Sequence, residues 1–247
     1  MIYNQRMRIA QLFVTCLVDT FFPEVGEATV SVLQRSGVRV EFPREQTCCG
    51  QPMFNAGLRA SARRIAEHTV RVFEAVRGDV VMPSGSCAHM IRHNYAELFS
   101  DDPAWKRRAR ELAARTYELT EYLVDVLGVT DCKASWHGPL TYHPTCHLHR
   151  GLGVDRQPRL LLENVRGAEV LQLPEAEDCC GFGGVFSVEQ PELSAELLKR
   201  KITNFEATGS PTLVVCDTGC LMHIQGGLQR SKRTQKVLHI AEVLAHE

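Results

Sequence analysis

A duplicated arrangement of cysteines constrains this chain more than any other feature. Ten of its 247 residues are cysteines, and eight of the ten form two groups of four with nearly the same internal spacing. Each cysteine of the first group has a counterpart 130 to 133 residues later. The first quartet is Cys16, Cys48, Cys49 and Cys87, and the second quartet is Cys146, Cys179, Cys180 and Cys220. A repeat of this length indicates two copies of one structural unit, which we expect over residues 1–130 and 131–247.

The sequence around the cysteines repeats as well. Thr47-Cys48-Cys49-Gly50 corresponds to Asp178-Cys179-Cys180-Gly181, so each adjacent cysteine pair is followed by a glycine. The two copies also end alike, with Glu118-Leu-Thr-Glu-Tyr-Leu in the first and His239-Ile-Ala-Glu-Val-Leu in the second. Several agreeing segments make chance spacing a poor explanation of the duplication.

Short apolar runs predict three strands in each copy, over residues 8–14, 38–42 and 79–82, then 139–143, 168–173 and 212–215. Helices are predicted between them. Apolar residues recur in steps of three and four from Leu58 to Val76, and Asp102-Pro103 is typical of an N-cap before a first-turn proline. Ser187 and Gln190 have the spacing of a capping box. Alternating strands and helices predict an α/β fold of two tandem, pseudo-symmetric parallel-sheet repeats with helices on both faces.

The cysteines follow the carboxyl ends of the predicted strands. In open α/β sheets this edge is where ligands bind. We therefore expect the first quartet to gather in one crevice and the second quartet in another.

Composition narrows the classes of function. With 28 Lys+Arg against 29 Asp+Glu, the net charge of −1 gives no reason to expect nucleic acid or anionic lipid as a partner. No apolar run approaches the ~20 residues of a membrane span, and the N-terminal residues lack a signal-peptide pattern. We expect a cytoplasmic protein, in which clustered thiols are typical of metal or redox sites rather than of disulfides.

Four thiolates suit either an iron–sulfur cluster or zinc. A disulfide between Cys48 and Cys49 is disfavoured, because adjacent Cα atoms lie about 3.8 Å apart and bridged cysteines need about 4.4 Å or more. Adjacent cysteines in a loop also point apart, which suits several irons better than one zinc ion. All eight cysteines of the two quartets are therefore candidate iron–sulfur ligands, with zinc as the alternative. We expect Cys132 to be a packing residue.

For several other residues near the quartets, the sequence allows more than one role. Gly50 and Gly181 allow a positive φ or a close approach to a cofactor. Four histidines can supply a ligand, carry a proton or serve as loop residues: His143, His147, His149 and His223. Three acidic residues are expected to form caps or turns: Asp19, Asp178 and Asp217.

Together these motifs resemble the cysteine-rich CCG domain, which is found in heterodisulfide reductase and in the iron–sulfur subunit of glycolate oxidase. The resemblance is strongest to the lactate-utilization branch of that family. The matching motifs are Cys48-Cys49-Gly50-Gln51-Pro52, Pro83-Ser84-Gly85-Ser86-Cys87, Cys146-His147-Leu148-x-Arg150-Gly151-Leu152-Gly153 and Cys179-Cys180-Gly181-Phe182-Gly183-Gly184.

The resemblance implies up to two iron–sulfur clusters per chain, of the [4Fe–4S] type, held by the eight cysteines. It also implies an electron-transfer subunit of a complex that oxidises L-lactate, or a related 2-hydroxy acid, to pyruvate with two sibling subunits. The chain has no G-x-G-x-x-G motif opening a βα unit, and thus no apparent nicotinamide or flavin site of its own. The alternatives are a cluster-based thiol–disulfide reductase of the heterodisulfide type and a zinc-bound structural module.

One departure from the wider family concerns its terminal Cys-x-x-Cys motif. Here the first cysteine of that motif is replaced by Ser84 in the first copy and by Asp217 in the second. A five-thiolate site is therefore not expected in the first copy. In the second copy, Cys216 is a possible substitute ligand.

Overall fold

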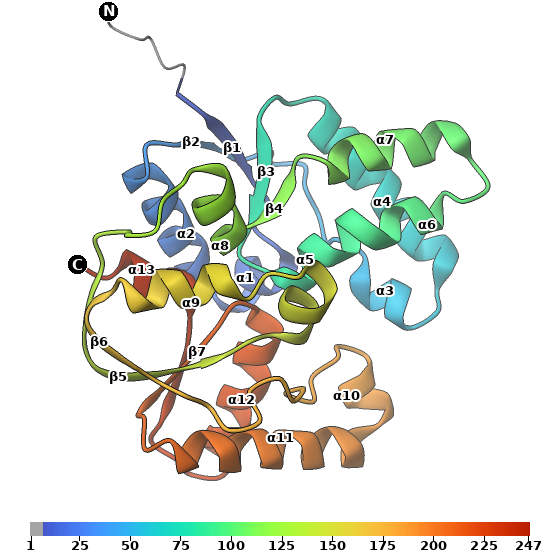
Figure 1. Cartoon of the computed structure of the whole chain (residues 1–247). Coiled ribbons are helices and arrows are strands. Elements are labelled where there is room, and N and C mark those ends of the chain that lie inside the picture. Colours follow the sequence, from blue (N-terminus) through green and yellow to red (C-terminus); the bar gives the residue numbers. More distant parts are fainter. Residues whose placement is uncertain (1–6) are drawn as a thin grey trace, which may run out of the picture.

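The computed structural model describes residues 7–247 and has an α/β architecture (Figure 1). The first six residues, which begin the segment assessed above for a signal peptide, lie outside the described part. Within residues 7–247, no helix is both long enough and apolar enough to cross a membrane.

Two four-stranded parallel sheets with the same strand order organise the chain. The first has the order β2-β1-β3-β4 and contains β1 (Ile9–Leu12), β2 (Arg39–Glu41), β3 (Asp79–Met82) and β4 (Thr116–Glu118). The second has the order β6-β5-β7-β8 and contains β5 (Ser135–His143), β6 (Arg166–Leu171), β7 (Thr212–Val215) and β8 (Lys236–His239). The predicted tandem parallel-sheet repeats are confirmed.

Helices connect the strands and cover both sheets. In the first repeat they are α1 (Cys16–Phe21), α2 (Pro23–Arg35), α3 (Gln51–Asn55), α4 (Arg59–Glu74), α5 (Gly85–His89), α6 (Tyr95–Leu98), α7 (Pro103–Ala113) and α8 (Leu119–Glu121). In the second they are α9 (Arg156–Glu163), α10 (Phe186–Glu189), α11 (Pro191–Ala207), α12 (Thr218–Arg230) and α13 (Ile240–Ala245). Three short π-helical turns cover Met90–Asn94, Tyr122–Val126 and His147–Gly151.

Local sequence explains where some of these helices begin. Asp102 caps α7 as predicted, because its carboxylate accepts hydrogen bonds at 3.1 Å from the N–H groups of Ala104 and Trp105. The capping box predicted at Ser187 is wrong. Ser187 lies inside α10, where its hydroxyl donates to the Gly184 carbonyl, and the longer helix α11 starts separately at Pro191.

The two repeats share one core between their sheets. Helices α2 and α13, one from each repeat, pack against each other there, together with apolar residues of both sheets such as Val81 and Leu140. Helices α4 and α7 cover the opposite side of the first repeat, whereas α11 and α12 cover that of the second (Figure 1). This shared layer sets how the carboxyl ends of the two sheets face each other.

Glu118, at the end of β4, is fully buried in this core. One carboxylate oxygen accepts hydrogen bonds from Thr120 and from the Glu121 N–H group, while the other has no partner among the described residues. Burial raises the pKa of this carboxyl from 4.5 to about 8. Near neutral pH the folded protein therefore holds a proton that the unfolded chain has already lost.

We expect wild-type stability to fall relative to Glu118→Gln as the pH rises through this window. Between the unfolded and the folded pKa, each pH unit lowers the free energy of unfolding by roughly 1.4 kcal/mol, because only the unfolded state has lost the proton. Urea unfolding of both proteins in the same metal state, at about pH 5.5 and about pH 7.5, measures the difference. An identical pH dependence of the two proteins would show that Glu118 is already ionised in the fold.

Candidate metal centre

Three loops at the carboxyl ends of neighbouring strands build each quartet. Cys16 begins α1 just after β1, the Cys48–Cys49 pair follows β2, and Cys87 lies in α5 after β3. Because the strand order is β2-β1-β3, these three strand ends are adjacent. The second sheet repeats the arrangement with the ends of β6, β5 and β7. As predicted, each fold repeat brings together four cysteines from three segments that are distant in sequence.

Sulfur atoms within each quartet lie in hydrogen-bond contact as pairs, and all ten cysteines are free thiols. In the first quartet, the Sγ atoms of Cys16 and Cys48 are 3.6 Å apart, and those of Cys49 and Cys87 are 3.3 Å apart. In the second, Cys180 Sγ lies 3.1 Å from Cys220 Sγ. These are distances at which a thiol donates its proton to a neighbouring sulfur, and the same sulfurs can bind metal once those protons leave.

One cysteine thiol in each quartet has a strongly lowered pKa. The hydrogen bond from the Cys16 thiol, with a second from Cys49, lowers the pKa of Cys48 to about 3. The counterpart Cys179 has its pKa lowered to about 2, first by the Cys146 thiol and then by Cys180. The pKa of each partner thiol is raised in turn. Since the thiolate is the form that binds metal, each quartet already holds one ligand in its reactive form.

A glycine after each cysteine pair stabilises that thiolate. Gly50 and Gly181 have positive φ values of 85° and 92°, which aim their N–H groups at Cys48 Sγ and Cys179 Sγ, 3.4 and 3.3 Å away. At Gly181 a Cβ atom would also lie 2.6 Å from the Ser194 carbonyl oxygen. Glycine is therefore required for the turn, and the close approach at Gly181 is to the protein's own backbone.

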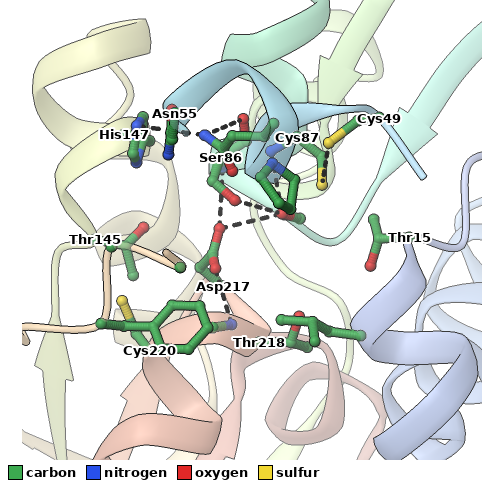
Figure 2. Close-up of a pocket in the computed structure, with 18 of the residues that line it drawn as sticks. Thr15, Cys49, Asn55, Ser86, Cys87, Thr145, His147, Asp217, Thr218 and Cys220 are labelled. Atoms are coloured by element: carbon green, nitrogen blue, oxygen red, sulfur yellow. Dashed lines mark hydrogen bonds between the residues drawn. The ribbon is translucent and has the colours of Figure 1, made fainter. Parts of the chain in front are cut away.

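Both quartets line one cavity (Figure 2), so the expectation of two separate crevices is wrong. Ser84 and Asp217 form an antiparallel bridge between the repeats, and the Gly85 N–H group donates to the Cys216 carbonyl at 3.4 Å. The carboxyl ends of β3 and β7 therefore meet, and the two sheet edges enclose a common space.

Asp217 is the centre of this junction and is almost fully buried, at 7% exposed. Its Oδ2 accepts from the Ser84 hydroxyl at 3.1 Å and from the Ser86 N–H group at 3.0 Å, while its Oδ1 accepts from the Gly219 N–H group at 3.0 Å (Figure 2). It caps α12, as expected for this residue. Its link to the other repeat was not predicted. The two positions that replace a family cysteine thus hydrogen-bond to each other.

The four histidines differ in their distance from the sulfurs. A ring nitrogen of His143 and the Sγ atoms of Cys180 and Cys220 all lie within 4.8 Å of one another. Burial lowers the pKa of His143 to about 3, so its ring is neutral. His147 lines the cavity with Nδ1 3.7 Å from Cys146 Sγ. The other two contact different partners: His223 lies near Ser194, and His149 lies near Asp155 and Glu177.

The remaining two cysteines lie in the hydrophobic core. Cys132 is 6% exposed and packs in the core shared by the repeats, which confirms its predicted packing role. Burial raises the pKa of its thiol to about 11. Cys216 is completely buried in the same core, with its thiol 3.7 Å from the Tyr142 hydroxyl. The structure therefore directs Cys216 away from the cavity where a substitute ligand would have to lie.

Cys132→Ser should leave the bound metal unchanged. The substitution places a hydroxyl in an apolar core and should cost about 1–2 kcal/mol of stability. Metal analysis and chemical unfolding of the same preparation measure both effects. A loss of metal would show that Cys132 is a ligand and not a packing residue.

Comparison with known proteins shows that one domain family matches the chain twice, once in each repeat. The chain matches the cysteine-rich domain family CCG over residues 10–92 and 140–225, and each range contains one quartet. It is 50% identical over 233 residues to lactate utilization protein A of Shouchella clausii, covering 94% of this chain and 97% of that protein. It is 46% identical over 236 residues to lactate utilization protein A of Halalkalibacterium halodurans, covering 96% of each. The protein of the same name from Geobacillus kaustophilus is 49% identical over 233 residues, covering 94% of this chain and 97% of that protein.

A more distant similarity concerns the fold alone. The crystal structure of a hypothetical protein from Helicobacter pylori superposes with a TM-score of 0.65 at 11% identity. The match covers 98% of this chain and 49% of that one, so this chain spans about half of its length.

Proposed function

Because this chain belongs to the cysteine-rich CCG domain family, we propose that it is an iron–sulfur electron-transfer subunit that serves in the oxidation of L-lactate to pyruvate. The observation that carries the proposal is the convergence of eight free thiols, as two quartets, on one cavity. Four cysteine thiolates are the usual ligand set of a [4Fe–4S] cluster. Each quartet supplies one such set.

The protein's own groups are suited to holding such a cofactor. The cysteine loops are fixed by strand ends and by helices α1, α5 and α12, so the ligands are positioned by rigid elements. The Gly50 and Gly181 N–H groups donate to thiolates. These hydrogen bonds stabilise the negative charge on sulfur and thereby tune the redox potential of a bound cluster. When bound, an iron–sulfur cluster accepts and releases one electron at a time, so two clusters match the two electrons released by lactate oxidation.

Lactate enters through the relatives, whose names state lactate utilization. The cysteines offer no hydride acceptor, and the sequence has no dinucleotide fingerprint. In this proposal the substrate's C–H bond is broken elsewhere, in one of two sibling subunits of a lactate-oxidation complex. This chain then receives the electrons and passes them on.

The test is anaerobic purification of the chain alone and together with its two sibling subunits. Each preparation should be brown, and dithionite should bleach its visible absorption. L-lactate should bleach only the complex, while glycolate serves as the matched control for substrate choice. A colourless chain carrying stoichiometric zinc would overturn the proposal in favour of a structural module.

The shared cavity favours one second candidate. Because both quartets face the same space, a disulfide substrate bound there would reach the metal centres, and a thiol–disulfide reductase of the heterodisulfide type needs such access. Reduction of a disulfide by the chain without any sibling subunit would favour this candidate. Retention of full reductase activity in Cys49→Ser and Cys180→Ser would exclude it.

A further inference from the structure

The surroundings of the two quartets differ at one matched position. Phe13 lies three residues before Cys16, and His143 lies three residues before Cys146. Phe13 is fully buried and stacks on Phe73, with ring centroids 5.5 Å apart. The second repeat thus has an imidazole at a buried place where the first repeat has an apolar ring.

A hydrogen bond fixes the tautomer of His143. Its Nδ1 lies 3.2 Å from the carbonyl oxygen of Ala176. A carbonyl oxygen can only accept, so the proton of the neutral ring is on Nδ1, and Nε2 carries a lone pair. Lys201 holds the same carbonyl in place, since its Nζ donates to the oxygens of Glu175 and Ala176 at 3.0 Å each. The backbone therefore sets both the tautomer and the orientation of the ring.

The lone pair of Nε2 has no hydrogen-bond partner among the described residues, although the side chain is only 1% exposed. Leaving a buried acceptor unpaired costs about 1–3 kcal/mol, so an orphan of this kind in a native site needs an explanation. The explanation lies in its neighbours, because a ring nitrogen of His143 and the Sγ atoms of Cys180 and Cys220 lie within 4.8 Å of one another, and Nε2 is the nitrogen of that ring that is not bonded to the Ala176 carbonyl.

A metal-bound histidine typically donates its other ring N–H to a backbone carbonyl, as His143 does. We propose that His143 Nε2 is a metal ligand of the second quartet in place of one of its four thiolates, so that this quartet binds its metal through nitrogen and sulfur, whereas the first quartet uses sulfur alone. The inference rests on the proposed function only in requiring that the second quartet hold a metal.

Unequal ligation makes the two centres unequal in redox potential. An imidazole ligand is neutral and a thiolate is negative, so nitrogen ligation favours the reduced state and raises the potential. The buried ammonium of Lys201 acts in the same direction. Its counterpart in α4 is the uncharged Thr69, since Lys201 and Thr69 each lie four residues before a buried phenylalanine. Electrons are therefore expected to pass from the first centre to the second.

Pulsed electron paramagnetic resonance of the reduced, anaerobically purified chain tests this ligand. The wild type should show strong nitrogen hyperfine coupling from a directly bound imidazole. His143→Phe, which copies the first repeat, should lose that coupling and lower the midpoint potential of one centre only. His143→Cys should keep its metal without the coupling, which covers the case in which the phenylalanine variant does not fold. His223→Phe is the matched control and should change neither reading.

Other outcomes separate this inference from the proposed function. Two loaded centres without nitrogen coupling would overturn the His143 assignment and leave the proposed function standing. Zinc in place of iron would overturn the proposed function, and X-ray absorption at the zinc edge would then decide the ligand by a nitrogen scatterer that His143→Phe removes. A chain that binds no metal would overturn both.

Discussion

Cys49→Ser should remove about half of the iron from the anaerobically purified protein, and Cys180→Ser should remove the other half. Cys49 and Cys180 are the buried members of the adjacent pairs, and their sulfurs lie 3.3 and 3.1 Å from Cys87 and Cys220. Each lies in a loop of its own repeat, so loss of one site should leave the other loaded. Iron per chain, measured against a protein standard, gives the result.

Two controls make this test specific. Cys132→Ser should keep all of the iron, and the double variant of Cys49 and Cys180 should keep almost none. If either single variant retains its full iron, that cysteine is not a ligand. If either single variant loses all of its iron, the two quartets do not bind metal independently.

Asp217→Ala should destabilise the metal-free protein by roughly 3–5 kcal/mol. The substitution removes the acceptor of three donors at the junction of the repeats, and each buried donor left unpaired costs about 1–3 kcal/mol. Asp217→Asn keeps an acceptor oxygen and should lose less. Chemical unfolding under anaerobic conditions measures the differences.

Asp178→Ala is the matched control for this prediction. Asp178 precedes the second cysteine pair, and its partner is Arg200 in a partly exposed ion pair, so its removal should cost at most about 1 kcal/mol. Equal destabilisation by the two alanine variants would show that the carboxylate of Asp217 does not join the repeats.

The sequence predicted the strands that consist of nearly uninterrupted apolar runs. β3 and β7 were predicted with the bounds that the structure shows. The last strand of each sheet, β4 and β8, was not predicted, because these short segments mix polar with apolar residues and do not form an apolar run. The predicted capping box at Ser187 failed because the residue spacing does not reveal the break between α10 and α11.

The two quartets followed from spacing and strand order, whereas the shared cavity did not. It depends on how the repeats pack, and thus on a hydrogen bond between Ser84 and Asp217, which are 133 residues apart. The sequence carried a partial signal, since both positions depart from the same family motif. Nothing local shows that the two side chains meet. His143 was one of four candidate histidines, and only the Ala176 carbonyl identifies which ring nitrogen is left free for a metal.

The most direct test of the central claim is the number of iron and acid-labile sulfide atoms per chain in protein purified without oxygen. Two [4Fe–4S] clusters predict about eight of each. About two zinc ions per chain with no sulfide would contradict the account, because the quartets would then be structural sites without a redox role.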